Sequence, residues 1–114
     1  MKNEKLYGLK FATVYPLYVQ KVERKGHTKE EVDTAIGWLT GYDPNGIVNQ
    51  IDMDVNLEEF ILNAPQINPK YVDVKGVICG VRVEDLQDPV EKQIRILDKL
   101  VDDIAKGKKK LPWS

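Results

Sequence analysis

The chain has 114 residues, of which 42% are hydrophobic and 31% are charged. This length suits one domain around one buried core, and the composition is that of an ordinary globular protein. Its 17 basic and 18 acidic residues give a formal net charge of −1, so no overall field attracts nucleic acid or an anionic membrane.

The single cysteine, Cys79, cannot form a disulfide within the chain, which fits a reducing compartment. The first residues contain no apolar run of signal-peptide length, and no stretch approaches the roughly 18 apolar residues of a membrane span. We therefore expect a cytoplasmic protein without a membrane segment. We also expect one domain over residues 1–114, with loose ends at 1–10 and 108–114.

The first predicted helix is capped by Thr13 and ends near Lys25 and Gly26. Pro16 then falls in the first turn, where no amide partner is lost. An aromatic-rich stripe follows helical spacing. It consists of Phe11, Tyr15, Tyr18, Val19 and Val22.

The second predicted helix runs from Thr28 to Tyr42 and has signals at both ends. Thr28 and Glu31 form a capping box, and Gly41 can adopt the left-handed conformation that ends a helix. Gly37 lies on the far side of the helix, where a neighbour could approach closely, although a tolerated weak point is the favoured interpretation. The buried stripe is Val32, Ala35, Ile36 and Leu39, extended by Tyr42 and edged by Trp38.

Two short helices are predicted next. Asp43 followed by Pro44 starts the first of them. Asn56 and Glu59 form a second capping box, and that helix stops before Pro65. The inward residues are Ile47, Val48 and Ile51 in one helix, and Leu57, Phe60 and Ile61 in the other.

Residues 71–83 are rich in valine and isoleucine, with two glycines among them. This composition favours extended structure, with a small hairpin turning near Lys75 and Gly76.

The last predicted helix is capped by Asp88, begins at Pro89 and ends at Gly107, with Glu91 completing the box. Ile96 and Leu100 add a second apolar flank to its main stripe. A face this wide indicates that the helix either crosses the bundle or offers a surface to a partner. The main stripe is Val90, Ile94, Leu97, Val101 and Ile104.

Several common chemistries are disfavoured. One histidine and one cysteine cannot make a zinc site within one chain, and His27 and Cys79 lie in unlike segments, so a nucleophilic pair is not expected. The calcium-loop pattern opening at Asp52 fails, with Leu57 where glycine is needed and Asn63 where glutamate is needed. No phosphate-binding glycine loop occurs. We predict no catalytic residue, no metal site and no cofactor.

The pattern also argues against nucleic-acid binding. The short helix PNGIVNQI, where a recognition helix would lie, contains no lysine or arginine. The basic run at 106–110 suits the C-terminal end of a helix, where cations complement the helix dipole.

The aromatic residues allow two interpretations. Tyr15, Tyr18, Trp38 and Tyr42 could converge in a small-molecule pocket between the first two helices, with Arg82 as a candidate to hold an anion. Alternatively, the aromatic side chains belong to the core with polar tips at the surface, and Arg82 pairs with a nearby acid on a strand.

Several long blocks of the chain resemble the small bacterial proteins of domain-of-unknown-function family 2200. They are FATVYPLYVQKVERKGHTKEEVDTAIGWLTGY, APQINP, GVICGVRVEDLQDP and IRILDKLVDDIAKGK. The resemblance covers roughly residues 8–110 and implies a small cytosolic, mainly helical protein. It implies no activity for any residue.

Together these patterns predict a mainly α, compact orthogonal helical bundle with an extended or hairpin segment near 71–83, with α+β as the alternative. For function, they favour a non-enzymatic binding or protein-interaction module, with a possible homodimer. The second hypothesis is a small-molecule binder or enzyme that uses the aromatic pocket.

Overall fold

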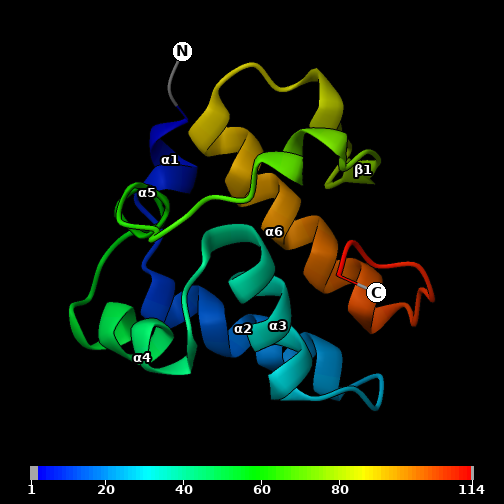
Figure 1. Cartoon of the computed structure of the whole chain (residues 1–114), viewed down its shortest axis with the longest axis horizontal. Coiled ribbons are helices and arrows are strands. Elements are labelled where there is room, and N and C mark those ends of the chain that lie inside the picture. The colour runs from blue at the N-terminus through cyan, green and yellow to red at the C-terminus, as the bar shows by residue number, and fades with distance from the viewer. Residues whose placement is uncertain (1–2, 114) are drawn as a thin grey trace.

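The computed structural model describes residues 3–113, and the mainly α class with a small hairpin is confirmed (Figure 1). Expectations for residues 1, 2 and 114 lie outside the described residues. The α-helices are α1 (Glu4–Tyr7), α2 (Phe11–Glu23), α3 (Lys29–Thr40), α4 (Pro44–Asp52), α5 (Leu57–Leu62) and α6 (Pro89–Ala105). Between α5 and α6 lie the 3-10 helix η1 (Pro69–Asp73), strands β1 (Val77–Ile78) and β2 (Val81–Arg82), and the 3-10 helix η2 (Val83–Asp85).

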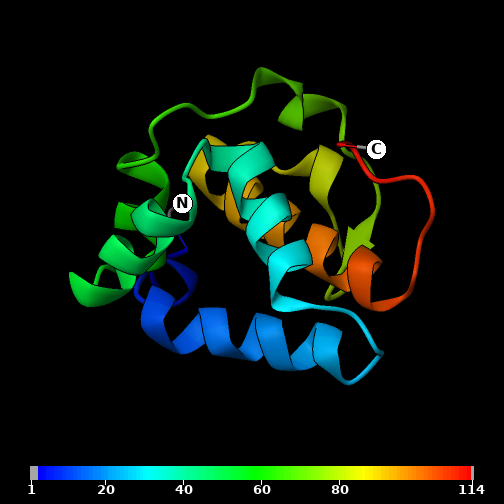
Figure 2. The same cartoon turned by 60° about the horizontal axis from the view of Figure 1, so that its bottom comes forward.

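Helix α6 crosses the bundle and packs against α2, α3 and α5, with the hairpin and η2 also against it (Figures 1 and 2). This placement explains the width of its apolar face, because both flanks are buried within the chain. The buried apolar residues of α6 are Ile94, Ile96, Leu97, Leu100, Val101, Ile104 and Ala105. The face therefore belongs to the core, and Val90 packs against that core at the helix start.

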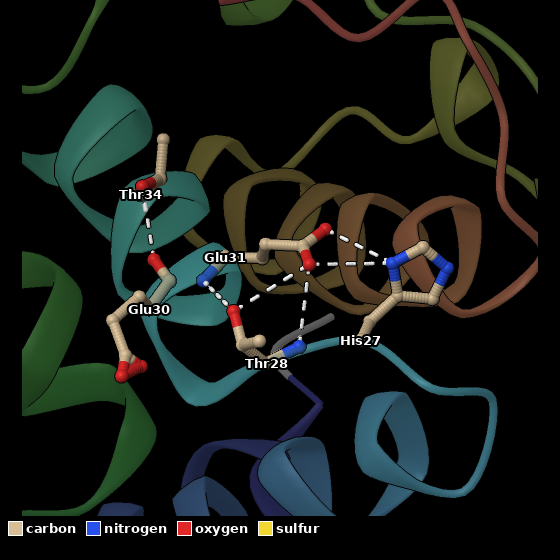
Figure 3. Close-up of polar contacts among 5 residues, drawn as sticks. All are labelled: His27, Thr28, Glu30, Glu31 and Thr34. Atoms are coloured by element: carbon tan, nitrogen blue, oxygen red, sulfur yellow. Dashed lines mark hydrogen bonds and ion pairs between the residues drawn. The ribbon is translucent and has the colours of Figure 1, made fainter.

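The capping signals predicted at Thr28, Asp43 and Asn56 are confirmed. In α3, Thr28 Oγ1 accepts a hydrogen bond from Glu31 N, and Glu31 Oε1 accepts one from Thr28 N (Figure 3). Gly41 ends this helix with φ +79°. Asn56 and Glu59 make the same reciprocal pair at α5, and Asp43 caps α4. These signals work because a helix end satisfies its free amides with nearby side chains.

At α6, Asp88 caps the helix by accepting hydrogen bonds from Val90 N and Glu91 N. The predicted box is not completed, because the Glu91 side chain accepts a hydrogen bond from Asn3 Nδ2 at 3.0 Å instead. This contact joins the first described residue to the start of α6.

The predicted start of α2 at Thr13 is wrong. The helix begins at Phe11, because a bridge between Lys10 and Asn56 fixes the chain before it. Phe11 N donates to the carbonyl of Val55 at 3.0 Å, and Leu57 N donates to the carbonyl of Leu9 at 2.9 Å. Pro16 consequently lies inside the helix, where it cannot supply an amide to the preceding turn.

The predicted inward position of Val48 in α4 is also wrong, since its side chain is 53% exposed. The buried positions of this helix are Ile47 and Gln50, with Ile51 packed partly against the core. These positions follow the three- and four-residue spacing of one helical face, and Val48 lies to one side of it.

The hairpin turns at Cys79 and Gly80, and the predicted turn near Lys75 and Gly76 is wrong. Cys79 has φ +52° and Gly80 has φ +77°, the pair of positive angles that a two-residue hairpin turn of the primed type requires. The paired residues are Val77 with Arg82, and Ile78 with Val81. Extended pairing is therefore limited to four residues, and 3-10 helices occupy both flanks of the predicted extended segment.

The prediction that the N-terminal residues are loose is wrong for residues 4–10. Glu4–Tyr7 forms α1, and its apolar residues Leu6 and Tyr7 are buried in the core. At the other end, residues 108–110 are exposed, whereas Leu111 and Trp113 pack partly against the core. Within residues 3–113, no helix combines the length and apolar character needed to cross a bilayer.

Candidate functional site

Three of the five predicted site residues are part of the core. Tyr15, Tyr18 and Tyr42 are all buried. The Tyr15 hydroxyl donates to Asp33 at 2.5 Å, and the Tyr42 hydroxyl donates to the carbonyl of Phe60 at 2.8 Å. The Tyr18 hydroxyl donates to Asp98. This arrangement matches the interpretation of aromatic core residues with polar tips.

The surroundings of these hydroxyls keep them protonated. Burial raises the pKa of Tyr15 and that of Tyr42, each to about 12. Burial also holds the pKa of Tyr18 well above its ordinary value and raises that of Asp98. Because a buried phenolate would lose its hydration, the three hydroxyls act as hydrogen-bond donors near neutral pH.

The other two predicted residues lie elsewhere. Arg82 is exposed on β2. Backbone hydrogen bonds lower the pKa of the Glu84 carboxyl, and the positive charge of Arg82 lowers it further. Trp38 is half-buried on α3 and faces Trp113, with ring centroids 6.5 Å apart and an angle of 55° between the rings. Trp38 alone among the five lines the cleft described next.

A cleft of about 400 Å³ opens between α3, the segment 70–75, α6 and the C-terminal segment 110–112. We call it the lysine cleft. Its apolar lining is Trp38, Val74, Leu100, Leu111 and Pro112. Its charged lining is Lys70, Asp73, Lys75, Lys99, Asp103 and Lys110.

The floor of the lysine cleft carries a buried ion pair supplied by α6. Lys99 Nζ lies 2.6 Å from Asp103 Oδ2, and the two side chains are only 8% and 10% exposed. Lys108 Nζ approaches the other carboxylate oxygen of Asp103 at 3.2 Å. The carboxylate of Asp103 therefore pairs with two ammonium groups, that of Lys99 in the cleft and that of the exposed Lys108.

Gly76 creates the space that the Lys99 side chain occupies. A Cβ added at Gly76 would lie 2.2 Å from Lys99 Cε, far inside contact distance. The backbone of residue 76 and the stem of Lys99 are thus packed directly on each other. Any larger residue at 76 must displace Lys99.

The rim of the lysine cleft carries Lys70, Lys75 and Lys110, all of them exposed. Among residues 3–113, none of these three ammonium groups lies within ion-pair distance of a carboxylate. The lining holds four lysines against two aspartates, and Asp103 is already neutralised. The cleft is therefore a locally basic site on a chain whose net charge is near zero.

A smaller cleft of about 260 Å³ also has Trp38 in its lining, together with Gly37, Gly41 and residues of the segment 66–69. That segment is held on α3 by hydrogen bonds from Gln66 N to Thr40 O (3.0 Å) and from Asn68 N to Leu39 O (2.8 Å). A Cβ added at Gly37 would lie 3.2 Å from the carbonyl of Tyr42, so the position is more closely packed than a tolerated weak point.

Sequence reasoning missed the lysine cleft because four separated segments build it and no local motif marks it. One signal was present. Lys99 and Asp103 fall at helical spacing from Ile96 and Leu100, within the second apolar flank of α6. Two charged residues in a buried flank indicate a paired, enclosed site.

The potential catalytic and metal-binding residues of the sequence are separated in the fold. His27 Nδ1 contacts Glu31 at 3.1 Å beside the α3 cap (Figure 3), whereas Cys79 is exposed in the hairpin turn. Within residues 3–113, no three side chains of histidine, cysteine, aspartate or glutamate are grouped to hold a metal ion.

The fold and the cleft define a small helical-bundle protein with one amphipathic, basic recess beside its central helix. The chain belongs to the family described as "Uncharacterized protein conserved in bacteria (DUF2200)", whose model matches residues 5–111. It is similar to a solved structure titled "Crystal structure of uncharacterized protein SP1917", with 46% sequence identity and a TM-score of 0.87. That match covers 94% of this chain and 88% of the other. No curated protein matches the chain.

Proposed function

We propose that this protein is a non-enzymatic binding module and that the lysine cleft is its small-molecule site. The observation that carries the proposal is the combination of an apolar wall and a basic lining in one recess of about 400 Å³. Small-molecule sites have volumes of about 300–1,000 Å³ and combine apolar walls with a few placed polar groups. We further propose that it acts in the cytoplasm, as its single cysteine suggests.

The binding role is favoured over catalysis by where the reactive side chains lie. His27 contacts Glu31 beside the cap of α3, and Cys79 is exposed in the hairpin turn, so the two reactive side chains lie apart. The hydroxyls of the three buried tyrosines donate hydrogen bonds to groups within the chain. The aromatic residue that supports a ligand site is Trp38, on the side of α3 that faces α6 and the C-terminal segment.

A homodimer or a protein partner remains a proposal with less support. The wide apolar face of α6, which motivated it, is occupied by the core. Light scattering at high micromolar concentration tests the dimer directly, and a monomer mass would remove it.

The basic run at 106–110 gives nucleic-acid binding less support in the structure than in the sequence. Lys106 pairs with Asp102 at 2.9 Å, and Lys108 pairs with Asp103. Two charges of the run are thereby used within the chain.

The experiment that tests the proposal is a thermal-shift screen of neutral and charged fragments, followed by one matched pair of variants. Val74 lines the cleft, and Val72, two residues earlier in the same segment, is exposed outside it. Because a ligand that binds only the native state raises the melting temperature, binding fragments should stabilise the wild type and Val72→Phe. Val74→Phe fills the cleft and should lose the shift. Equal shifts in both variants would place the binding elsewhere and refute the proposal.

A further inference from the structure

We propose that the ligand of the lysine cleft is a small organic anion, a carboxylate or phosphate on an apolar body, and that Lys99 holds its charged group. This inference rests on the proposed function, because it names the ligand class of the same site. The inference goes beyond the proposed function because it assigns Lys99, at the floor of the cleft, as the residue that binds the charged group.

The first argument is the hydrogen-bonding state of Lys99. Its ammonium group has three donors, and within residues 3–113 Asp103 is its one partner, at 2.6 Å. The side chain is 8% exposed and lines the cleft. Asp103 takes one of these donors, so the other two can point to an acceptor that enters the cleft. A carboxylate or phosphate oxygen provides the strongest such acceptor.

The second argument is the charge around that position. The charge of Asp103 at the floor is shared between Lys99 and the exposed Lys108, so it does not serve Lys99 alone. Lys70, Lys75 and Lys110 add positive charge at the rim, against Asp73 alone. A neutral ligand would leave this excess uncompensated, whereas an anion neutralises it in a partly desolvated recess.

The third argument is preorganisation. The Lys99 stem passes directly over Gly76, where even one added carbon would collide with it. A lysine side chain usually loses considerable rotamer freedom when it binds a ligand. Here the Lys99 side chain is buried and packed on Gly76 before any ligand binds, so part of that freedom is already lost. The apolar wall of Trp38, Leu100 and Leu111 then accommodates the body of the ligand.

The test uses three probes with one ring: benzoate, phenyl phosphate and the neutral benzamide, each titrated and followed by NMR. The wild type should bind benzoate or phenyl phosphate at least about tenfold more tightly than benzamide, since a charge-assisted hydrogen bond is lost with the neutral probe. Whichever of the two anions binds more tightly distinguishes a carboxylate from a phosphate ligand. Lys99→Met should abolish the preference for anions. Lys109→Met, an exposed lysine outside the cleft, should keep it.

A second measurement guards against a Lys99→Met variant that does not fold. In the wild type, the 13Cε resonance of Lys99 should shift on adding the anion and stay in place with benzamide. Equal binding of benzoate, phenyl phosphate and benzamide, or an unmoved Lys99 signal at saturation, would overturn the inference. Such a result leaves the proposed function standing if Val74→Phe still abolishes the fragment shifts, so the two failures are distinguishable.

Discussion

At the scale of single residues, Gly41 combines two demands in one position. It ends α3 with φ +79°, a conformation that residues with a Cβ rarely adopt. It also lies against the backbone of Gln66, where an added Cβ would be 3.1 Å from the amide nitrogen and 3.2 Å from the carbonyl oxygen. The close contact goes with the hydrogen bonds from Gln66 N and Asn68 N that hold the segment 66–68 on the end of α3, and Gly41 and Gln66 both line the smaller cleft.

We predict that Gly41→Ala destabilises the protein more than Gly26→Ala does. Both glycines have positive φ, +79° and +83°, but a Cβ at Gly26 would meet nothing within 4 Å. Gly26→Ala should therefore cost about 1–2 kcal/mol from backbone conformation alone. Gly41→Ala should cost about 1 kcal/mol more, because the backbone of Gln66 must also move. Urea unfolding of the two variants measures the difference, and equal losses would show that the close packing at Gln66 has no energetic weight.

At the scale of elements, the helices that were predicted correctly are those whose ends are defined locally. The boxes at Thr28 and Asn56 and the cap at Asp88 involve residues two or three positions apart, so a single stretch of sequence carries the whole signal. The start of α2 depends instead on the bridge between Lys10 and Asn56, which no local pattern reveals. The hairpin turn was misplaced for a similar reason, since Cys79 adopts a positive φ that its residue type does not indicate.

The capping box of α3 gives a prediction at this scale. Thr28→Ala removes the hydroxyl that accepts from Glu31 N and should cost about 1 kcal/mol of folding free energy. The matched control is Thr34→Ala in the same helix (Figure 3), whose hydroxyl donates only to the carbonyl of Glu30 on an exposed face. That change should stay within about 0.5 kcal/mol. Chemical denaturation of both variants checks the prediction, and a Thr28→Ala loss no larger than that of Thr34→Ala would contradict it.

At the scale of the whole molecule, α6 organises both the core and the candidate site. Its two apolar flanks are covered by α2, α3 and α5, and at one edge of the second flank Lys99 and Asp103 form the floor of the lysine cleft. The sequence predicted the helix and its unusual width correctly. It left open whether that width served the core or a partner, because periodicity shows that a face is apolar without showing what covers it.

The candidate site was less predictable than the fold. Trp38 was among the residues expected to contact a ligand, whereas the other contributors to the lysine cleft come from the segments 70–75, 99–103 and 110–112. Their side chains meet only because the chain returns over α6 after Gly107 and because Gly76 lets Lys99 pass. Such convergence depends on tertiary packing, so composition and spacing do not reveal it.

The most direct test of the central claim is a 1H–15N chemical-shift map of the wild-type protein, titrated with the fragment that stabilises it most. If the lysine cleft is the binding site, the largest shifts should appear at the indole N–H of Trp38 and at the amides of Val74, Lys75, Leu100 and Leu111. If the largest shifts fall instead around Tyr15 and Tyr42, or are spread over the exposed faces of α2 and α4, the account of the cleft as the binding site is contradicted.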